Sequence, residues 1–299
     1  MSARTSIMKA GAATVTFLII ALAQVAAATG PSPQALAAFN KYVAQAEAQI
    51  RQEEGAPDTF LGVQAFPSPS PNALEERPRR GEIVITSGGI TPVEVPGGLV
   101  HHWVGIEFIP RTTITQVFAI LQNYDQMARY FSPDVAASHL VKRHGDDFHV
   151  SMRLRQHKII TVMLDGLYDV KYGRLDDDHQ YCASHSMQMV EVSDDPSSTG
   201  GGADADGEDG AAASGTDHGF LWRTNAYWRF QRADGGVFVE FESISLSRNV
   251  PAGWGWLIEP FIRDVPRESL LFTLRATRKA VLASNVSDEP EVAPLQHRP

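Results

Sequence analysis

The sequence predicts an α+β fold in which a curved antiparallel sheet wraps around a long C-terminal helix, with two short helices after the first strand. Three observations lead to this prediction. From residue 99 onwards, segment after segment alternates between apolar and polar side chains, which is typical of strands with one solvated face. Two short helical patterns follow the first of these segments. An amphipathic helical pattern at 266–283 closes the series.

The chain opens with a pattern typical of export. Arg4 and Lys9 precede an apolar stretch at 10–23, and three alanines at 26–28 fit the small-residue rule for cleavage. We expect residues 1–28 to be a secretory signal peptide, so that the mature chain is secreted or periplasmic. An uncleaved membrane anchor is the alternative, although the stretch is shorter than the ~20 residues that span a bilayer. No later stretch is apolar enough to cross a membrane.

The composition of the chain limits the kinds of molecule that it is expected to bind. The formal net charge is −9, and a nucleic-acid partner, which normally needs a basic face, is not expected. Many of the acids gather at 193–217, where large apolar side chains are almost absent. We expect a disordered acidic insertion there, because such a segment cannot offset the entropy of ordering. The single cysteine, Cys182, cannot form an internal disulfide.

Two segments precede the expected sheet. Residues 32–55 carry the pattern of an amphipathic helix that Ser32 can cap. Its apolar face must dock either on the main domain or on a partner. Residues 56–98 are rich in proline and glycine and are interpreted as a linker, with a short extra strand compatible with 82–86. At the other end, residues 284–299 are expected to be a disordered tail.

The elements within 99–283 follow in a definite order. Residues 99–109 alternate as a strand, and Thr113 with Gln116 makes the capping box of a first short helix. A second short helix is expected at about 125–131. Four strand patterns follow, and two more strands meet at a turn made by Asp234, Gly235 and Gly236. The four strands are expected at about 135–143, 147–156, 158–172 and 180–192.

This order resembles the START-like, or SRPBCC, helix-grip superfamily, which includes lipid-transfer domains, polyketide cyclases/dehydrases and pollen-allergen-like proteins. The resemblance covers 99–283. It is clearest at TTITQVFAILQNYDQMARYFSPDV, 112–135, and at GGVFVEFESISLSRNVPAGW, 235–254. It implies a deep apolar cavity between the sheet and the long helix. The superfamily has no universal catalytic residue, so the resemblance assigns none here.

Alternation and helical spacing predict which side chains line such a cavity. Trp254, in the loop before the long helix, is added because such a loop can gate the cavity mouth in the resembling fold. The remaining set consists of inward-facing strand residues and two helix residues opposite them: Phe148, Val150, Met152, Val162, Leu164, Met187, Thr224, Trp228, Val239, Phe241, Leu270 and Leu274.

Polar groups inside the cavity would distinguish binding from catalysis. His102 and His185 fall on the strand faces that alternation assigns to the interior, and Asp165 could join them as an acid or base. Neither C-x-x-C nor H-E-x-x-H occurs in the sequence. No metal ion or other cofactor is therefore expected.

The sequence favours a secreted or periplasmic protein that holds a hydrophobic or amphipathic, lipid-like small molecule in an internal cavity. Two alternatives stay open. A cyclase/dehydrase-type enzyme, acting on a polycyclic or polyketide-like substrate, needs acid or base groups inside the cavity. An interaction module of the cell envelope needs the apolar face of 32–55 to dock on a partner.

Overall fold

The computed structural model describes residues 30–65, 73–157, 161–192, 221–249 and 255–287. The expectations for the signal peptide at 1–28, for the acidic insertion at 193–217 and for Trp254 lie outside these residues. Among the described helices, none combines the length and the apolar character needed to cross a membrane.

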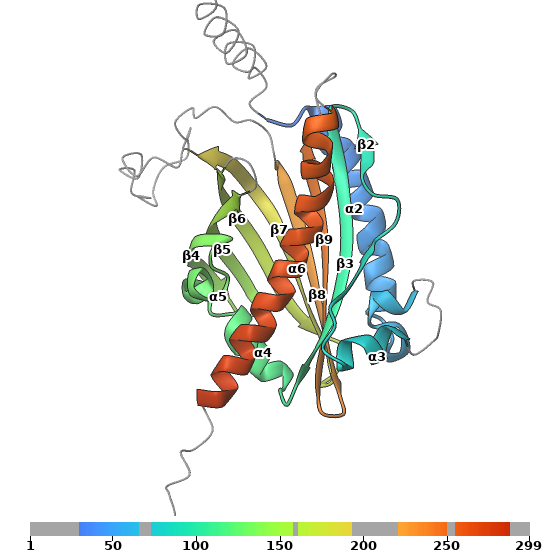
Figure 1. Cartoon of the computed structure of the whole chain (residues 1–299), viewed down its shortest axis with the longest axis vertical. Helices are drawn as coiled ribbons and strands as arrows, with labels where there is room; N and C mark the ends of the chain where they lie inside the picture. Colours follow the sequence, from blue (N-terminus) through green and yellow to red (C-terminus); the bar gives the residue numbers. More distant parts are fainter. Residues whose placement is uncertain (1–29, 66–72, 158–160, 193–220, 250–254, 288–299) are drawn as a thin grey trace, which may run out of the picture.

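An antiparallel sheet forms the body of the described chain and curves around a single long helix (Figure 1). Its strands lie in the order β1-β3-β9-β8-β7-β6-β5-β4, and β2 pairs with β3. The helix, α6 (Gly255–Ser287), lies against the concave face. The strands are β1 (Val84–Ser87), β2 (Val93–Val95), β3 (Gly98–Pro110), β4 (Val135–His144), β5 (Asp147–His157), β6 (Thr161–Arg174), β7 (His179–Val192), β8 (Arg223–Ala233) and β9 (Gly236–Arg248).

Two short helices follow β3 and pack into the same core as α6. The first, α4 (Ile114–Leu121), begins with the expected capping box: the Thr113 hydroxyl accepts from the Gln116 N–H, and the Gln116 side chain accepts from the Thr113 N–H. A 3₁₀ turn (Tyr124–Gln126) then leads into α5 (Met127–Tyr130). Sheet, short helices and long helix together confirm the predicted α+β, helix-grip fold class.

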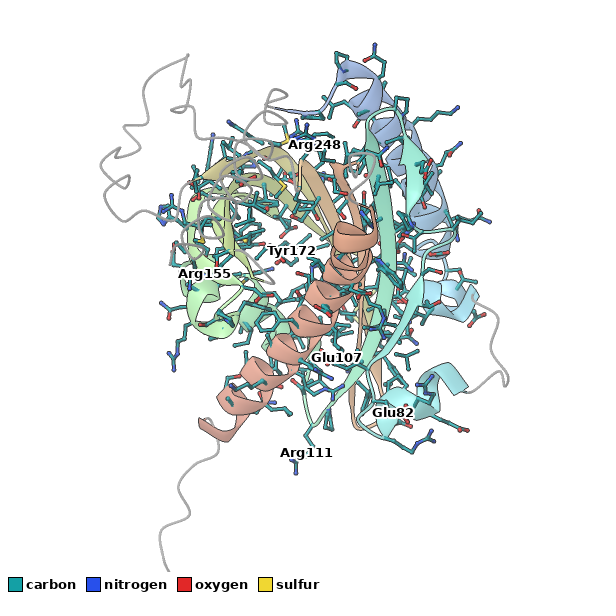
Figure 2. The ribbon with its side chains drawn as sticks, turned by 45° about the horizontal axis from the view of Figure 1, so that its top comes forward. Glu82, Glu107, Arg111, Arg155, Tyr172 and Arg248 are labelled. Atoms are coloured by element: carbon teal, nitrogen blue, oxygen red, sulfur yellow. The ribbon has the colours of Figure 1, made fainter. Side chains whose placement is uncertain are left out.

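The long helix α6 extends beyond the range read from the sequence. It begins at Gly255, well before 266, and ends at Ser287, so that residues 284–287 of the predicted tail are helical. In its later turns Leu274 and Val281 are fully buried against the sheet side of the core. Arg278 adds an ion pair to Glu107 of β3, with 2.9 Å between Nε and Oε2. Figure 2 places Glu107 beside this part of α6.

The helix α2 (Pro33–Glu53) packs on the opposite, convex face of the sheet. Ser32 caps it, with the hydroxyl accepting from the Ala35 N–H at 3.0 Å. Its apolar side contacts Val100, Trp222, Tyr227, Ile244 and Leu246 of the main domain. The sequence left open whether this helix packs on the main domain or on a partner. In the structure it packs on the main domain.

The interpretation of 56–98 as a linker is wrong for much of that segment. Residues 57–65 form two 3₁₀ turns, η1 (Pro57–Thr59) and η2 (Gly62–Ala65), and are followed by α3 (Ala73–Arg79), β1 and β2. Phe60, Leu61 and Val63 are fully buried against the convex face. The proline and glycine content masked this short apolar cluster, which docks because the convex face presents apolar side chains to it.

Candidate functional site

A cavity of about 300 Å³ lies on the concave side, between the sheet, the middle turns of α6 and the short helices. Its walls are mostly apolar. Figure 2 shows Tyr172 of β6 in the space between the sheet and α6. A single helix cannot fill the whole concavity of a strongly curved sheet, because its side chains reach only the strands beneath it. The space that remains lies over the inward residues of β5, β6, β7, β8 and β9.

The structure divides the predicted cavity residues into two groups. Phe148, Val150, Val239 and Leu274 face the concave side but are buried in the packed core beside the cavity. The others that the structure describes on the cavity wall are Met152, Val162, Leu164, Thr224, Trp228, Phe241 and Leu270.

Met187 is not on the cavity wall, and its inward assignment is wrong. The β6–β7 register shifts at this point: Leu167 pairs with Gln188, whereas Tyr168 pairs with Ser186. The extra residue in β7 is Met187, which is 58% exposed. A bulge of this kind reverses the alternation along the strand. On the N-terminal side of the bulge, Cys182 points inward and lines the cavity. Alternation counted back from Met187 had assigned Cys182 to the outward face.

The inward assignments of His102 and His185 are also wrong. His102 lies on the convex face, where Nε2 is 2.7 Å from Glu242 Oε1 and Nδ1 is 3.0 Å from the Tyr42 hydroxyl. His185 also lies on that face, with Nε2 2.7 Å from Glu47 Oε1. Both faces of β3 are buried by other elements, so the alternation of residues along the strand could not show which of its faces is the concave face.

Polar groups do line the cavity, but they are not the ones that the sequence indicated. His101, the neighbour of His102, points inward, and its Nε2 lies 3.0 Å from Ser247 Oγ. Asp165 is excluded, because it pairs with Arg153 outside the cavity at 2.6 and 2.7 Å. A serine run on β9 could have indicated this side, since Ser243, Ser245 and Ser247 alternate with apolar or acidic residues.

Two tyrosines and the cysteine form a buried group in the same wall. The hydroxyls of Tyr124 and Tyr172 are 3.1 Å apart. Burial raises the pKa of the Cys182 thiol, and it raises the pKa of both phenols. These groups therefore remain protonated and neutral near pH 7. On the part of the wall that the structure describes there is no lysine or arginine.

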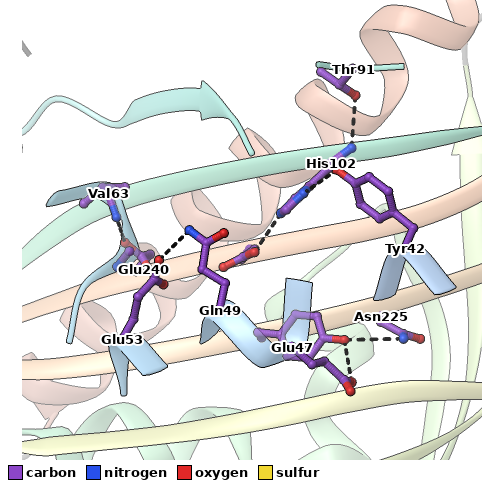
Figure 3. A network of polar contacts seen from close by, with 12 residues as sticks. Tyr42, Glu47, Gln49, Glu53, Val63, Thr91, His102, Asn225 and Glu240 are labelled. Atoms are coloured by element: carbon purple, nitrogen blue, oxygen red, sulfur yellow. Dashed lines mark hydrogen bonds and ion pairs between the residues drawn. The ribbon is translucent and has the colours of Figure 1, made fainter. Parts of the chain in front are cut away.

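A second buried polar cluster lies on the convex face, between α2 and the sheet (Figure 3). Its centre is Arg229 of β8, which is 1% exposed. The guanidinium lies 2.8 Å from Glu240, 2.9 Å from Glu53, 2.7 Å from Glu242 and 3.9 Å from Glu54. We refer to Arg229 and these four glutamates as the Arg229 cluster.

The Arg229 cluster is structural in character. The Glu240 carboxylate accepts hydrogen bonds from the N–H groups of Gly62 and Val63, at 3.0 and 2.8 Å. Burial raises the pKa of Glu54 and of Glu240 to about 7. The free space beside the cluster is only about 20 Å³, and the described residues contain no group suited to hold a metal ion. The cluster thus fastens α2 and η2 to the sheet.

The order of elements and the grip of the sheet on α6 make the fold START-like. No protein-family model and no curated protein matches the sequence. Among solved structures, a STAR-related lipid transfer protein from Xanthomonas axonopodis is similar at 17% identity, with a TM-score of 0.43, over 64% of this chain and 96% of that one.

Two further solved structures are similar at lower identity. The aromatase/cyclase Zhui from a Streptomyces species is 11% identical, with a TM-score of 0.42, over 62% of this chain and 96% of its own. Human STARD10 is 8% identical, with a TM-score of 0.42, over 78% of this chain and 82% of its own.

Proposed function

We propose that the protein is a secreted or periplasmic carrier that holds a hydrophobic or amphipathic small molecule in the cavity beneath α6. The cavity itself supports this proposal. Its volume of about 300 Å³ is within the range of ligand pockets, about 300–1,000 Å³, and its walls are mostly apolar, as theirs are.

The groups named as examples for a cyclase/dehydrase-type enzyme, which needs acid or base groups inside the cavity, are not found there. His102, His185 and Asp165 lie outside the cavity. His101 and Asp134 line the described wall, so the preference for a carrier rests on the mostly apolar character of that wall. The envelope-module alternative required a free apolar face on α2, and this face is covered by the sheet.

Blocking the cavity tests the carrier function. Ala226 of β8 lines the cavity, so Ala226→Trp fills it. We expect the wild type to bind fluorene, a fluorescent apolar probe, with micromolar or lower Kd, and the variant to bind it at least tenfold more weakly. Val141→Trp is the matched control, because residue 141 is exposed on β4. The carrier proposal fails if the wild type binds no apolar probe, or if the folded Ala226→Trp variant binds as well as the wild type.

The natural ligand and the location can be tested together. Protein purified from its own host is examined by native mass spectrometry for a bound small molecule, and its N-terminus is sequenced. Cleavage after Ala28 predicts a mature chain that starts near Thr29. A soluble cytoplasmic protein that retains Met1 would refute export and leave ligand binding untouched.

A further inference from the structure

A row of hydrogen-bonding side chains crosses the cavity face of the sheet. On β3, His101 is opposite Ser245 of β9, and Ser245 is opposite Thr224 of β8. The Thr224 N–H donates to the Ser186 hydroxyl on β7 at 2.9 Å, and Ser186 is opposite Tyr168 of β6. Side chains at paired positions of neighbouring strands point to the same face. The five residues therefore form one band across the sheet, which we call the polar row.

Tyr168 stands at the end of the polar row and is the part of it that points to a ligand. Its side chain lines the cavity and is 5% exposed. Its ring lies over Gly166, where even a methyl group would come within 2.6 Å of the ring. The Tyr168 hydroxyl has no hydrogen-bond partner among the described residues. Its oxygen has almost no accessible surface, and buried hydroxyls are nearly always paired, so it has an unmet hydrogen bond that a ligand reaching it can satisfy.

The charge of the wall limits what that molecule can be. The described wall carries no lysine or arginine that could pair with an anion, and it carries the Asp134 carboxylate. Apart from His101, a buried anionic group would find no side chain on this wall that can carry a positive charge, which is unfavourable. Serine, threonine and tyrosine hydroxyls, by contrast, donate and accept hydrogen bonds without charge.

We infer that the bound molecule is an uncharged apolar compound with a carbonyl or hydroxyl oxygen, and that this oxygen accepts a hydrogen bond from Tyr168. The inference rests on the proposed carrier function and adds the ligand class and its orientation. The apolar body of the ligand lies among the aliphatic and aromatic side chains. Its oxygen lies at the polar row, close to Tyr168.

Three probes of one shape test this inference: 9-fluorenone, which offers a carbonyl acceptor, fluorene, which has none, and fluorene-9-carboxylate. The variant is Tyr168→Phe, which removes only the hydroxyl. Because that hydroxyl has no partner in the described protein, we expect thermal stability to be at least as high as in the wild type. We expect fluorenone to bind about tenfold more weakly to the variant, with fluorene binding unchanged within about twofold.

Tyr227→Phe is the matched control. Its hydroxyl donates to Glu47 on the convex face, so the ratio of fluorenone to fluorene affinity should stay as in the wild type. If Tyr168→Phe changes both affinities equally or neither, the hydrogen bond is refuted while the carrier function stands. If fluorene-9-carboxylate binds the wild type more tightly than fluorenone, the uncharged ligand class is refuted. If none of the three binds, the carrier function itself fails.

Discussion

The two faces of the sheet carry different kinds of buried polar side chains, although the same strands form both faces. On β9, Ser243 and Ser245 face the cavity, whereas Glu240 and Glu242 face the convex side. Around the cavity the concave face keeps open space and carries hydroxyls, whereas the Glu107–Arg278 ion pair lies in the packed part of this face, under the later turns of α6. The convex face is closed and carries the Arg229 cluster.

The difference depends on which groups of the chain can pair with a buried polar side chain on each face. A buried charge is tolerated only with a fixed partner, and the chain supplies several to Arg229 at all times. In the cavity, polar groups pair with one another, as Tyr124 does with Tyr172 and His101 with Ser247, and the described wall carries no lysine or arginine. A permanent charge there would be unpaired in the empty protein, whereas a hydroxyl loses much less. Within the described residues, the Arg229 cluster thus lies on the face opposite the cavity.

Removing the central cation should have the largest effect. Arg229→Met leaves the surrounding glutamates without their counter-ion, and we expect the free energy of unfolding to fall by about 3–5 kcal/mol. Urea denaturation measures this. Arg232→Met on the same strand is the control, because Arg232 is 61% exposed in its pair with Asp178 and should lose less than about 1 kcal/mol. Equal losses for both variants would contradict the assignment of the Arg229 cluster as the convex anchor.

Replacing a small side chain with tryptophan distinguishes the packed core from the cavity within the concave face. Val239 is fully buried in the core, so Val239→Trp should destabilise the fold by about 1–3 kcal/mol. Ala226→Trp adds more atoms but points into open space, so its loss of stability should be smaller. Thermal denaturation of the two variants without ligand compares them. A larger loss for Ala226→Trp would mean that the cavity is closed in solution.

The buried glutamates on the convex face should also make the stability of the fold depend on pH. Burial raises the pKa of Glu54 and Glu240 to about 7, above the ordinary value of about 4.3 in the unfolded chain. The folded state therefore holds more protons between these values, and stability should fall as the pH rises from about 5 to 8. Glu54→Gln should flatten this fall in melting temperature, whereas Glu76→Gln, at an exposed pair with Arg80, should not. A stability that rises over this range would contradict the shifts.

The smallest effect is expected for the histidine that sequence alternation placed inside. His185 is 40% exposed beside Glu47, so His185→Ala should change the free energy of unfolding by less than about 1 kcal/mol. Because it faces away from the cavity, fluorene affinity should stay the same. A tenfold loss of affinity in the folded variant would place His185 near the ligand after all.

The fold could be predicted because alternation, caps and turns are local signals. The capping box at Thr113 and Gln116 is an example, since both partners lie within one turn of the chain. The wrong assignments have non-local causes. The inward side of β3 is decided by what covers each face, and the bulge at Met187 by pairing with another strand.

The Arg229 cluster escaped prediction for a related reason. On β8 and β9, Arg229, Glu240 and Glu242 alternate with apolar residues, which is the pattern of a solvated face. That face is buried because α2 and the turn at 62–65 return to cover it. Burial of charges by a segment far away in sequence leaves no local pattern.

The way in which α6 is attached has a mechanical consequence. Its later turns are held by Leu274, Val281 and the ion pair from Arg278 to Glu107. Its middle turns border the cavity, where Ser269 receives a 3.2 Å hydrogen bond from Gln156 of β5. We therefore expect that, if the cavity widens, the turns of α6 around Ser269 shift further from the sheet than the turns around Val281.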